Sequence, residues 1–599
     1  MTSSSDKLFT PAFFGVIGFV AVIHVAWWMF GTDQGMQGAF ADGDSYLRLI
    51  RIEQLLASWN WFDVTIPDTN APYGASVHWT RLFDVVILTV AAPIMMFTDT
   101  ARALFLSGMI ISPIIHLLSA AALIWAVKPL LGARSAYFVA AVSAAQAGIL
   151  AFAIIGRADH HMMFVLLVSL ALGFLIRLAR SQRERVNANA LLLGVTLAFG
   201  IWTGPEFLLF SLLVMALQWA CWIVGEENAG FINLRVAIGL YGGLVVMVLI
   251  ERGFSGALIV EYDKLSIVHV TFAAFALLFW IGGSLGTMQS KKLLYSVVTA
   301  LILGGVMVAL YPKIAGNPLN DANPKILPIY AMISEYRAIS DFPRFMIYFG
   351  SIAFAAPWLG WRIWQNRQGD YRWIWLLLGI EFVLYLTLAI NWLRWSLYAA
   401  LFISICMGDM IACIDERISR KVKFPARVLA KASAIFALSV GTLIIGASLL
   451  HAGKTEQERM AEKINSCPVV ELAGFLNQSP LGDMPKTIVA SANFGAEIIY
   501  RTNHKVLATV HHRSVDGILD GYRILNGTDD SAVLKIINKR AIDLLILCPA
   551  SSNDAYFLLG DDANSLYKRL EAGSLSYWVK PVILPDVVTG NFLVFSIQR

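Results

Sequence analysis

Long apolar segments constrain this chain more than any other feature of its sequence. A helix that crosses the hydrocarbon core of a bilayer needs about 20 apolar residues. Such stretches lie at residues 11–30, 103–126, 133–154, 162–180, 190–203, 206–225, 232–250, 267–286, 292–311, 344–363, 372–391, 394–412 and 428–451. The sequence therefore predicts a polytopic α-helical membrane protein with about thirteen transmembrane helices.

The composition agrees with a membrane protein. Hydrophobic residues make up 57% of the chain and charged residues 15%, whereas soluble domains carry about 25% charged residues. The net charge of +5 is small for 599 residues, so we expect no nucleic-acid partner. The five cysteines show no CxxC spacing, which argues against a cysteine-based zinc site.

One apolar run, at residues 85–97, is ambiguous. It contains Pro93 and would span only about 20 Å as a helix. Lys and Arg accumulate in short cytoplasmic loops, and a span here would move every basic cluster outside. We therefore expect 85–97 to lie in or dip into the outer interface. The clusters that then face the cytoplasm are Lys128 with Arg134; Arg177, Arg180, Arg183 and Arg185; Lys291 with Lys292; Arg362, Arg367 and Arg372; and residues 416–427.

This topology predicts a cytoplasmic N-terminus and a division into two domains. Residues 1–451 form the transmembrane domain, and 452–599 form an extracytoplasmic domain. In the latter, segments such as TIVASA and NFLVFSIQR predict strands separated by helices, so we expect an α/β or α+β domain. Cys467 and Cys548 both fall there, and the sequence leaves open whether they form a disulfide or two buried thiols. The other outer segments are 31–102, 155–161 and 312–343.

Acidic motifs fall in these outer segments. ADGDSY in the first carries Asp42 and Asp44 on either side of a glycine, and such carboxylates suit a hard divalent cation such as Mg²⁺ or Mn²⁺. GRADHHMMF in the second carries Asp159, His160 and His161 where a helix leaves the membrane. That position requires water, a charge partner or a metal. Each motif alone also fits a solvated surface.

A third motif and several single residues complete the candidates. MISEYR carries Glu335 followed by Arg337, a pair that alone fits a surface ion pair. Arg394 near the outer end of its helix suits a phosphate or a snorkelling side chain. Glu206, in an outer turn, and His78, in the first outer segment, are additional candidates. Because the topology puts all three acidic motifs on one face, it favours a shared site.

The motifs together resemble the oligosaccharyltransferase catalytic subunits, a family of GT-C glycosyltransferases. DSYLRLIRIEQLL resembles the D-P-Y-Y-x-x-R segment of that family, and TNAPYGASVHWTRLFD resembles its later Y-P-x-G-x-x-x-x-W-x-P-L-F-D stretch. ADHHMMFVLLVSLAL resembles its D-H-H motif, MISEYR its T-I-x-E or S-V-x-E motif, and LRWSLYAALFI its R-F-x-x-Y helix. The resemblance implies a GT-C fold in a bacterial or archaeal cell (inner) membrane.

The resemblance also implies a reaction and its residues. A sugar or oligosaccharide would move from a polyprenyl-linked phosphate or pyrophosphate donor to a protein, lipid or glycan acceptor outside the cytoplasm. The implied roles are metal ligands Asp44, Asp159 and His161; donor phosphate ligand Arg394; and catalytic carboxylates Asp44, Glu335 and Asp42, the last with no assigned step.

The acceptor motif departs from the family. Members that glycosylate asparagine carry W-W-D-Y-G, whereas SANFG here places Ser491, Ala492 and Asn493 at the W-W-D positions. A standard N-glycosylation sequon is therefore not the expected acceptor. The alternatives left open are a polyprenyl-phosphate-monosaccharide transferase acting on a lipid or glycan, a non-catalytic relative, and a transporter or flippase of a lipid-linked glycan that uses the mid-span Glu381.

Overall fold

A bundle of long helices forms most of the molecule. The computed structural model describes residues 9–30, 38–179, 183–226, 228–285, 291–316, 326–330, 333–424, 426–455, 467–549 and 562–598. In these residues eleven helices are long and apolar enough to cross a membrane. They are α1 (Pro11–Met29), α4 (Thr100–Leu131), α7 (His161–Leu178), α8 (Arg183–Thr203), α9 (Leu208–Ile223), α10 (Ala229–Gly256), α11 (Ile267–Ser284), α12 (Lys292–Leu310), α16 (Arg372–Asn391), α17 (Ser396–Lys421) and α18 (Ala426–Ala452). The predicted polytopic membrane architecture is confirmed.

Two of the thirteen predicted spans are broken helices. The run at 133–154 forms α5 (Ala133–Ser143) and α6 (Ala147–Ala153), which are bent by 63°. A Cβ atom on Gly148 of α6 would lie 2.6 Å from the carbonyl oxygen of Ser396, so α6 packs directly on the backbone of α17. The run at 344–363 forms α14 (Phe342–Phe349) and α15 (Ile352–Gln365), which carry prolines at their start and interior, respectively.

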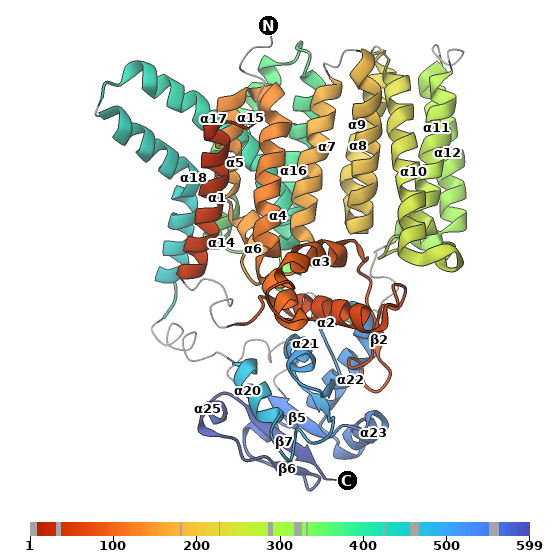
Figure 1. The fold of residues 1–599 in the computed structure, drawn as a ribbon, viewed down its shortest axis with the longest axis vertical. Helices are drawn as coiled ribbons and strands as arrows, with labels where there is room; N and C mark the ends of the chain where they lie inside the picture. The colour runs from red at the N-terminus through yellow and green to blue at the C-terminus, as the bar shows by residue number, and fades with distance from the viewer. Residues whose placement is uncertain are drawn as a thin grey trace.

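The ambiguous run forms a short helix at one end of the bundle. It begins three residues before the predicted run, as α3 (Leu82–Ile94), and its 13 residues are too few to span. Figure 1 shows α2 (Gly43–Ser58) and α3 lying across the ends of the spans, between the bundle and the C-terminal domain. A two-stranded ribbon, β1 (Thr65–Ile66) and β2 (Ala75–Ser76), connects them. Figure 1 also shows α1 running along the length of the bundle, beside α4 and α5.

The C-terminal domain is built on a five-stranded mixed sheet. Its strand order is β4-β3-β5-β7-β6, with β3 parallel to β4 and β5, and β7 antiparallel to β5 and β6. The strands are β3 (Thr487–Val489), β4 (Lys505–Val506), β5 (Leu544–Leu547), β6 (Val579–Pro581) and β7 (Leu593–Ile597), and the helices are α20 (Val469–Leu476), α21 (Ala492–Arg501), α22 (Val515–Leu525), α23 (Asp530–Arg540), α24 (Leu566–Glu571) and α25 (Asp586–Thr589). The predicted α/β character is confirmed.

Helices cover both faces of this sheet. Alternate strand residues point to opposite sides, so Ile488 packs in a core with α20 and α21, and Val489 in a core with α22, α23 and α24. A disulfide between Cys467 and Cys548 connects the start of the domain to the end of β5. Of the segments predicted to lie outside the membrane, residues 31–37, 317–325, 331–332, 456–466, 550–561 and 599 fall outside the described residues. So does Arg180 of the predicted cytoplasmic clusters.

Candidate active site

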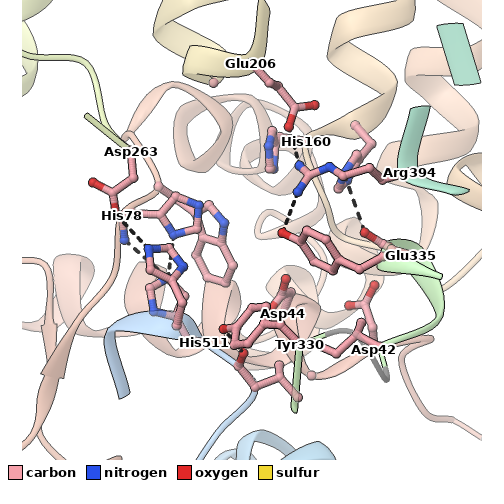
Figure 2. A pocket seen from close by; sticks show the side chains of 18 of the residues that line it. Asp42, Asp44, His78, His160, Glu206, Asp263, Tyr330, Glu335, Arg394 and His511 are labelled. Carbon is pink, nitrogen blue, oxygen red and sulfur yellow. Dashed lines mark hydrogen bonds and ion pairs between the residues drawn. The ribbon is translucent and has the colours of Figure 1, made fainter. Parts of the chain in front are cut away.

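A large cavity lies where the C-terminal domain meets the ends of the spans. Its volume is about 1670 Å³, and residues from the first loop, the 155–161 turn, the 312–343 loop and the C-terminal domain line it. The lining includes the predicted Asp42, Asp44, Glu335 and Arg394. Figure 2 shows these four on one side of the cavity, with His78, His511 and Asp263 on the other.

The two aspartates of the first loop stand at the start of α2. Asp42 is the N-cap residue, whose carboxylate accepts hydrogen bonds from the backbone N–H of Ser45 at 2.9 Å and from its hydroxyl at 2.6 Å. Asp44 lies in the first turn, where the helix dipole favours negative charge. Gly43 between them lies against the C-terminal domain, because an added Cβ would be in van der Waals contact with the side chains of Ala496 and Val510, at 3.4 Å from each. The C-terminal domain therefore packs directly on this acidic turn.

Asp159 lies behind two histidines at the start of α7. Its side chain is 3% exposed and does not line the cavity, whereas His160 and His161 do. One carboxylate oxygen contacts Nδ1 of His160 at 2.6 Å, and the other contacts Nδ1 of His161. These contacts leave Nε2 of His161 buried without a hydrogen-bond partner in the described part of the chain.

The carboxylate of Glu335 reaches this group from a 3₁₀ turn, η8 (Ser334–Tyr336). Its Oε2 lies 3.9 Å from Nε2 of His161. Glu335 also forms an ion pair with Arg157, whose Nε lies 3.3 Å from Asp42. Burial raises the pKa of the Glu335 carboxyl, but the charges of Arg157, His161 and Arg394 together outweigh burial, so the pKa is lowered. Thus Arg157, which lies inside the GRADHH motif, holds carboxylates of two loops together.

Among the carboxylates of the acidic motifs, Asp44 has the least positive charge nearby. Burial, followed by the charges of Asp42, Asp159 and Glu335, raises its pKa well above the usual range. Together with the buried, unpartnered Nε2 of His161, this donor set of carboxylate oxygens and one imidazole fits a divalent cation. The residues present can therefore hold the metal that the motifs imply.

Two buried arginines fix α2 from behind the acidic turn. Arg48 and Arg51, one and two turns along α2, both contact the fully buried Asp84, Arg48 at 3.3 Å and Arg51 at 2.5 Å. Arg81 adds a third contact to Asp84 at 3.1 Å. Nη2 of Arg48 also lies 3.3 Å from Nδ1 of His160. This arginine cluster, which the sequence did not predict, connects the first loop to α3 and to the Asp159 group.

The predicted phosphate ligand Arg394 lies just before α17, in the 3₁₀ turn η9 (Leu393–Trp395). Its guanidinium forms an ion pair with Glu206 and donates a hydrogen bond to the hydroxyl of Tyr336 at 2.6 Å. Figure 2 shows Arg394 between Glu206 and Glu335. Glu206, predicted as an extra acid of the metal site, is thus the partner of the arginine.

His78 belongs to a separate group on the other wall of the cavity. Its Nδ1 lies 2.6 Å from Nε2 of His511, and the neighbouring His512 contacts Asp263 at 2.7 Å. Burial and the nearby imidazoles lower the pKa of both His78 and His511. One sequence signal could have identified this group. His511 and His512 are the only two consecutive histidines among the described residues of the outer domain.

Two further predicted features can be located. Asn493, at the place of the family's acceptor motif, lines the cavity at the start of α21. Glu381 lies fully buried in α16, and neither carboxyl oxygen has a hydrogen-bond partner among the described residues. It does not line the cavity.

Comparisons with known proteins give a structural match only. No protein-family model and no curated sequence matches the chain. The archaeal oligosaccharyltransferase AglB from Archaeoglobus fulgidus, in complex with an inhibitory peptide and a dolichol-phosphate, superimposes with a TM-score of 0.65 at 13% identity, covering 90% of this chain and 69% of that chain. The apo form of the same organism's enzyme gives 0.66 at 13% with the same coverage.

A third structure of the Archaeoglobus fulgidus oligosaccharyltransferase, a complex with Zn and sulfate, gives a TM-score of 0.62 at 12% identity, covering 90% of this chain and 68% of that chain. At identities this low, the superpositions establish the fold alone. They cover 90% of the chain and so extend through both the bundle and the C-terminal domain. The chain therefore has the GT-C fold of a polytopic membrane protein, as its motifs predict.

Proposed function

We propose that this protein is a membrane glycosyltransferase that moves a sugar or oligosaccharide from a polyprenyl-linked donor to an acceptor outside the cytoplasm. One observation carries the proposal: the carboxylates of the first and the 312–343 loops, the histidines of the 155–161 turn and Arg394 line one cavity at the membrane end of a GT-C fold. Such convergence suits a reaction in which a phosphate leaves and a nucleophile attacks in the same space.

Each group has a role in that reaction. The guanidinium of Arg394 binds the donor phosphate through two parallel hydrogen bonds, in place of its present partner Glu206. A divalent cation such as Mg²⁺ or Mn²⁺ would be held by Asp44 and His161, and by Asp159 after its present contacts with the two histidines open. The cation would stabilise the negative charge of the departing phosphate. Glu335 orients the acceptor or takes its proton, and Asp42 keeps the turn of α2 in place as its N-cap.

The acceptor side of the cavity supports a substrate other than an N-glycosylation sequon. Asn493 and Glu497 of α21 and Glu471 of α20 line it, so the wall near the place of the family's acceptor motif offers amide and carboxylate hydrogen-bonding groups. Such groups suit the hydroxyls of a glycan. A glycan or lipid hydroxyl is the acceptor that we propose.

Further observations support the proposed donor and the proposed orientation of the protein in the membrane. The Archaeoglobus fulgidus oligosaccharyltransferase was solved in complex with a dolichol-phosphate and, in another structure, tethered with an acceptor peptide. This similarity of fold supports a polyprenyl-linked donor here. The disulfide between Cys467 and Cys548 supports an oxidising compartment for the C-terminal domain. We therefore place that domain outside a bacterial or archaeal cell membrane and the N-terminus in the cytoplasm.

Transfer by purified variants tests the proposal. The protein is supplied with a polyprenyl-linked sugar, a glycan acceptor and Mn²⁺, and the Asp44→Asn and Asp159→Asn variants are expected to lose about 100-fold or more of the transfer rate. The exposed Asp63 lies in the same loop but outside the cavity, so Asp63→Ala is the matched control with an unchanged rate. Unreduced transfer by both site variants would refute the metal-assisted mechanism.

One added variant separates the transporter alternative. Glu381 is buried away from the cavity, so Glu381→Gln should leave transfer unchanged in a glycosyltransferase. Loss of lipid-linked glycan movement in Glu381→Gln, with full function in Asp44→Asn, would instead identify a transporter.

A further inference from the structure

A group of three imidazoles joins the C-terminal domain to the membrane part. His78 follows β2 in the first loop, whereas His511 and His512 precede α22. The ring centroids of the three side chains lie 4.5 to 4.8 Å apart. Each residue offers one ligand nitrogen, and these nitrogens lie within 4.8 Å of one another. Figure 2 shows His78 and His511 side by side, apart from Asp44 and Glu335.

The surrounding contacts orient one of these rings. Nε2 of His512 lies 2.7 Å from the carboxylate of Asp263 and donates its proton to it. Asp263 is fixed in turn by the guanidinium of Arg513, which donates to both carboxylate oxygens at 2.6 and 3.0 Å. This arrangement leaves the lone pair of His512 on Nδ1. A carboxylate that holds the far nitrogen of an imidazole is the usual support of a metal-binding histidine.

We propose that His78, His511 and His512 bind a zinc ion, with Asp263 as the carboxylate that orients His512. Three imidazoles suit zinc, which prefers nitrogen ligands, better than Mg²⁺ or Mn²⁺. All three residues line the cavity, so the fourth position of a tetrahedral site is available to water or to a molecule in the cavity. The site is separate from the oxygen-rich Asp44 group and does not depend on the proposed function.

Binding requires one local rearrangement. In the present geometry Nε2 of His511 lies 2.6 Å from Nδ1 of His78, and its Nδ1 accepts a 3.2 Å hydrogen bond from the backbone N–H of Arg513. A zinc ion at Nε2 takes the place of the first contact and of a 3.3 Å hydrogen bond that the backbone N–H of His78 donates to the same nitrogen. It also moves the ring proton to Nδ1, so the contact with Arg513 opens. A tightly bound zinc ion stabilises a fold far more than one hydrogen bond does.

The site would clamp the two parts of the molecule. Its ligands come from the first loop and the C-terminal domain, and Asp263 comes from the loop between α10 and α11. Figure 2 shows His78, His511 and Asp263 on the side of the cavity opposite Arg394 and Glu335. Removal of zinc would therefore loosen the C-terminal domain from the bundle without changing the acidic group.

Cobalt titration of the full-length protein in detergent tests the proposal. Metal is first stripped with a chelator, and Co²⁺ is then added as a spectroscopic probe that zinc displaces. Intense tetrahedral cobalt absorption is expected for the wild type and for Asp159→Asn, which lacks the other candidate cation site. The absorption should disappear in His78→Gln and His512→Gln, and cobalt affinity should fall 10- to 100-fold in Asp263→Asn. The exposed His451 serves as the matched control, His451→Gln, with unchanged binding.

Two results would overturn the zinc site. One is the absence of tetrahedral cobalt absorption in the wild type, and the other is equal cobalt affinity in the wild type and His78→Gln. X-ray absorption of zinc-loaded Asp159→Asn needs no change in the histidines, so it decides the question even where their variants do not fold. Three imidazole ligands are expected, and an oxygen-only shell would reject the proposal.

Discussion

Nε of Arg157 lies 3.3 Å from Oδ2 of Asp42, so a guanidinium occupies the place where carboxylates of separate loops meet. The same guanidinium forms an ion pair with Glu335 and lies 4.0 Å from Asp159. Like charges at this density repel one another unless a cation is shared among them. Arg157 supplies part of that charge, and the electrostatics of the acidic group depend on it.

The first prediction concerns the charge of Arg157. The Arg157→Gln variant should lose on the order of 3 kcal/mol of stability in the absence of divalent metal, because it leaves partly buried carboxylates without their partner. Added Mn²⁺ should raise the melting temperature more in this variant than in the wild type, since the cation then supplies the missing charge.

Thermal unfolding followed by tryptophan fluorescence, with chelator or with Mn²⁺, measures both effects. Arg344→Gln is the matched control, because Arg344 is 56% exposed and pairs only with the nearby Asp341 in the described chain. Equal melting temperatures of Arg157→Gln and Arg344→Gln without metal would contradict the assigned role.

The second prediction concerns donor binding at Arg394. Arg394→Gln should weaken binding of the polyprenyl-phosphate donor by on the order of 100-fold, because it removes a partly buried charged partner of the phosphate. Glu206→Gln should act in the opposite direction and lower the donor KM, since the carboxylate that repels the phosphate is gone. Steady-state kinetics with varied donor measures both constants, and a parallel change in the two variants would argue against phosphate binding here.

The third prediction is that the stability of the contact between Asp263 and the C-terminal domain depends on pH. Burial raises the pKa of this carboxyl, but hydrogen bonds from His512 and Arg513 outweigh that effect and lower it below the usual range. A lowered pKa means that the ionised carboxylate stabilises the fold above the unfolded value of about 4, and that this contribution is lost as pH falls further.

The Asp263→Asn variant isolates this contribution. Its melting temperature should lie below that of the wild type at pH 7, and the gap should narrow only below about pH 4. Differential scanning fluorimetry across that range, with Asp63→Asn as an exposed control, measures the gap. A gap that already closes between pH 7 and pH 5 would mean that a histidine, not Asp263, titrates.

The fourth prediction concerns the disulfide of the C-terminal domain. Cys467 and Cys548 are 81 residues apart, so their bond closes a long loop of the unfolded chain. The double Cys→Ser variant should lose about 2–4 kcal/mol of domain stability. In unreduced membranes a thiol reagent should label neither cysteine, and labelling of both without reductant would place the domain in a reducing compartment.

The bundle and the position of the acidic motifs could be predicted from sequence because their signals are local. An apolar run of bilayer length directly predicts a transmembrane helix. The placement of Lys and Arg excluded 85–97 as such a helix, and most of this run forms the short α3. The breaks between α5 and α6 and between α14 and α15 were not predicted, since they depend on contacts with other helices, such as Gly148 against Ser396.

The partners of the site residues could not be predicted, because they come from segments far apart in the chain. Glu206 and Arg394 are 188 residues apart, and His78 and His511 are 433 apart. Arg157 lies in the GRADHH motif, which the sequence analysis identified. The sequence alone does not tell which carboxylates this arginine contacts. The roles of Asp44, Asp159, His161, Glu335 and Arg394 in a reaction remain predictions until the variants are measured.

The ion pairs of Asp84 connect two helices outside the spans. Asp84 lies in the first turn of α3, the helix lying across the ends of the spans, and it holds Arg48 and Arg51 of α2. A displacement of α3 by the surrounding lipid would therefore also displace α2, whose first turn carries Asp44. We expect transfer rates to depend on the detergent or lipid mixture in which the protein is measured.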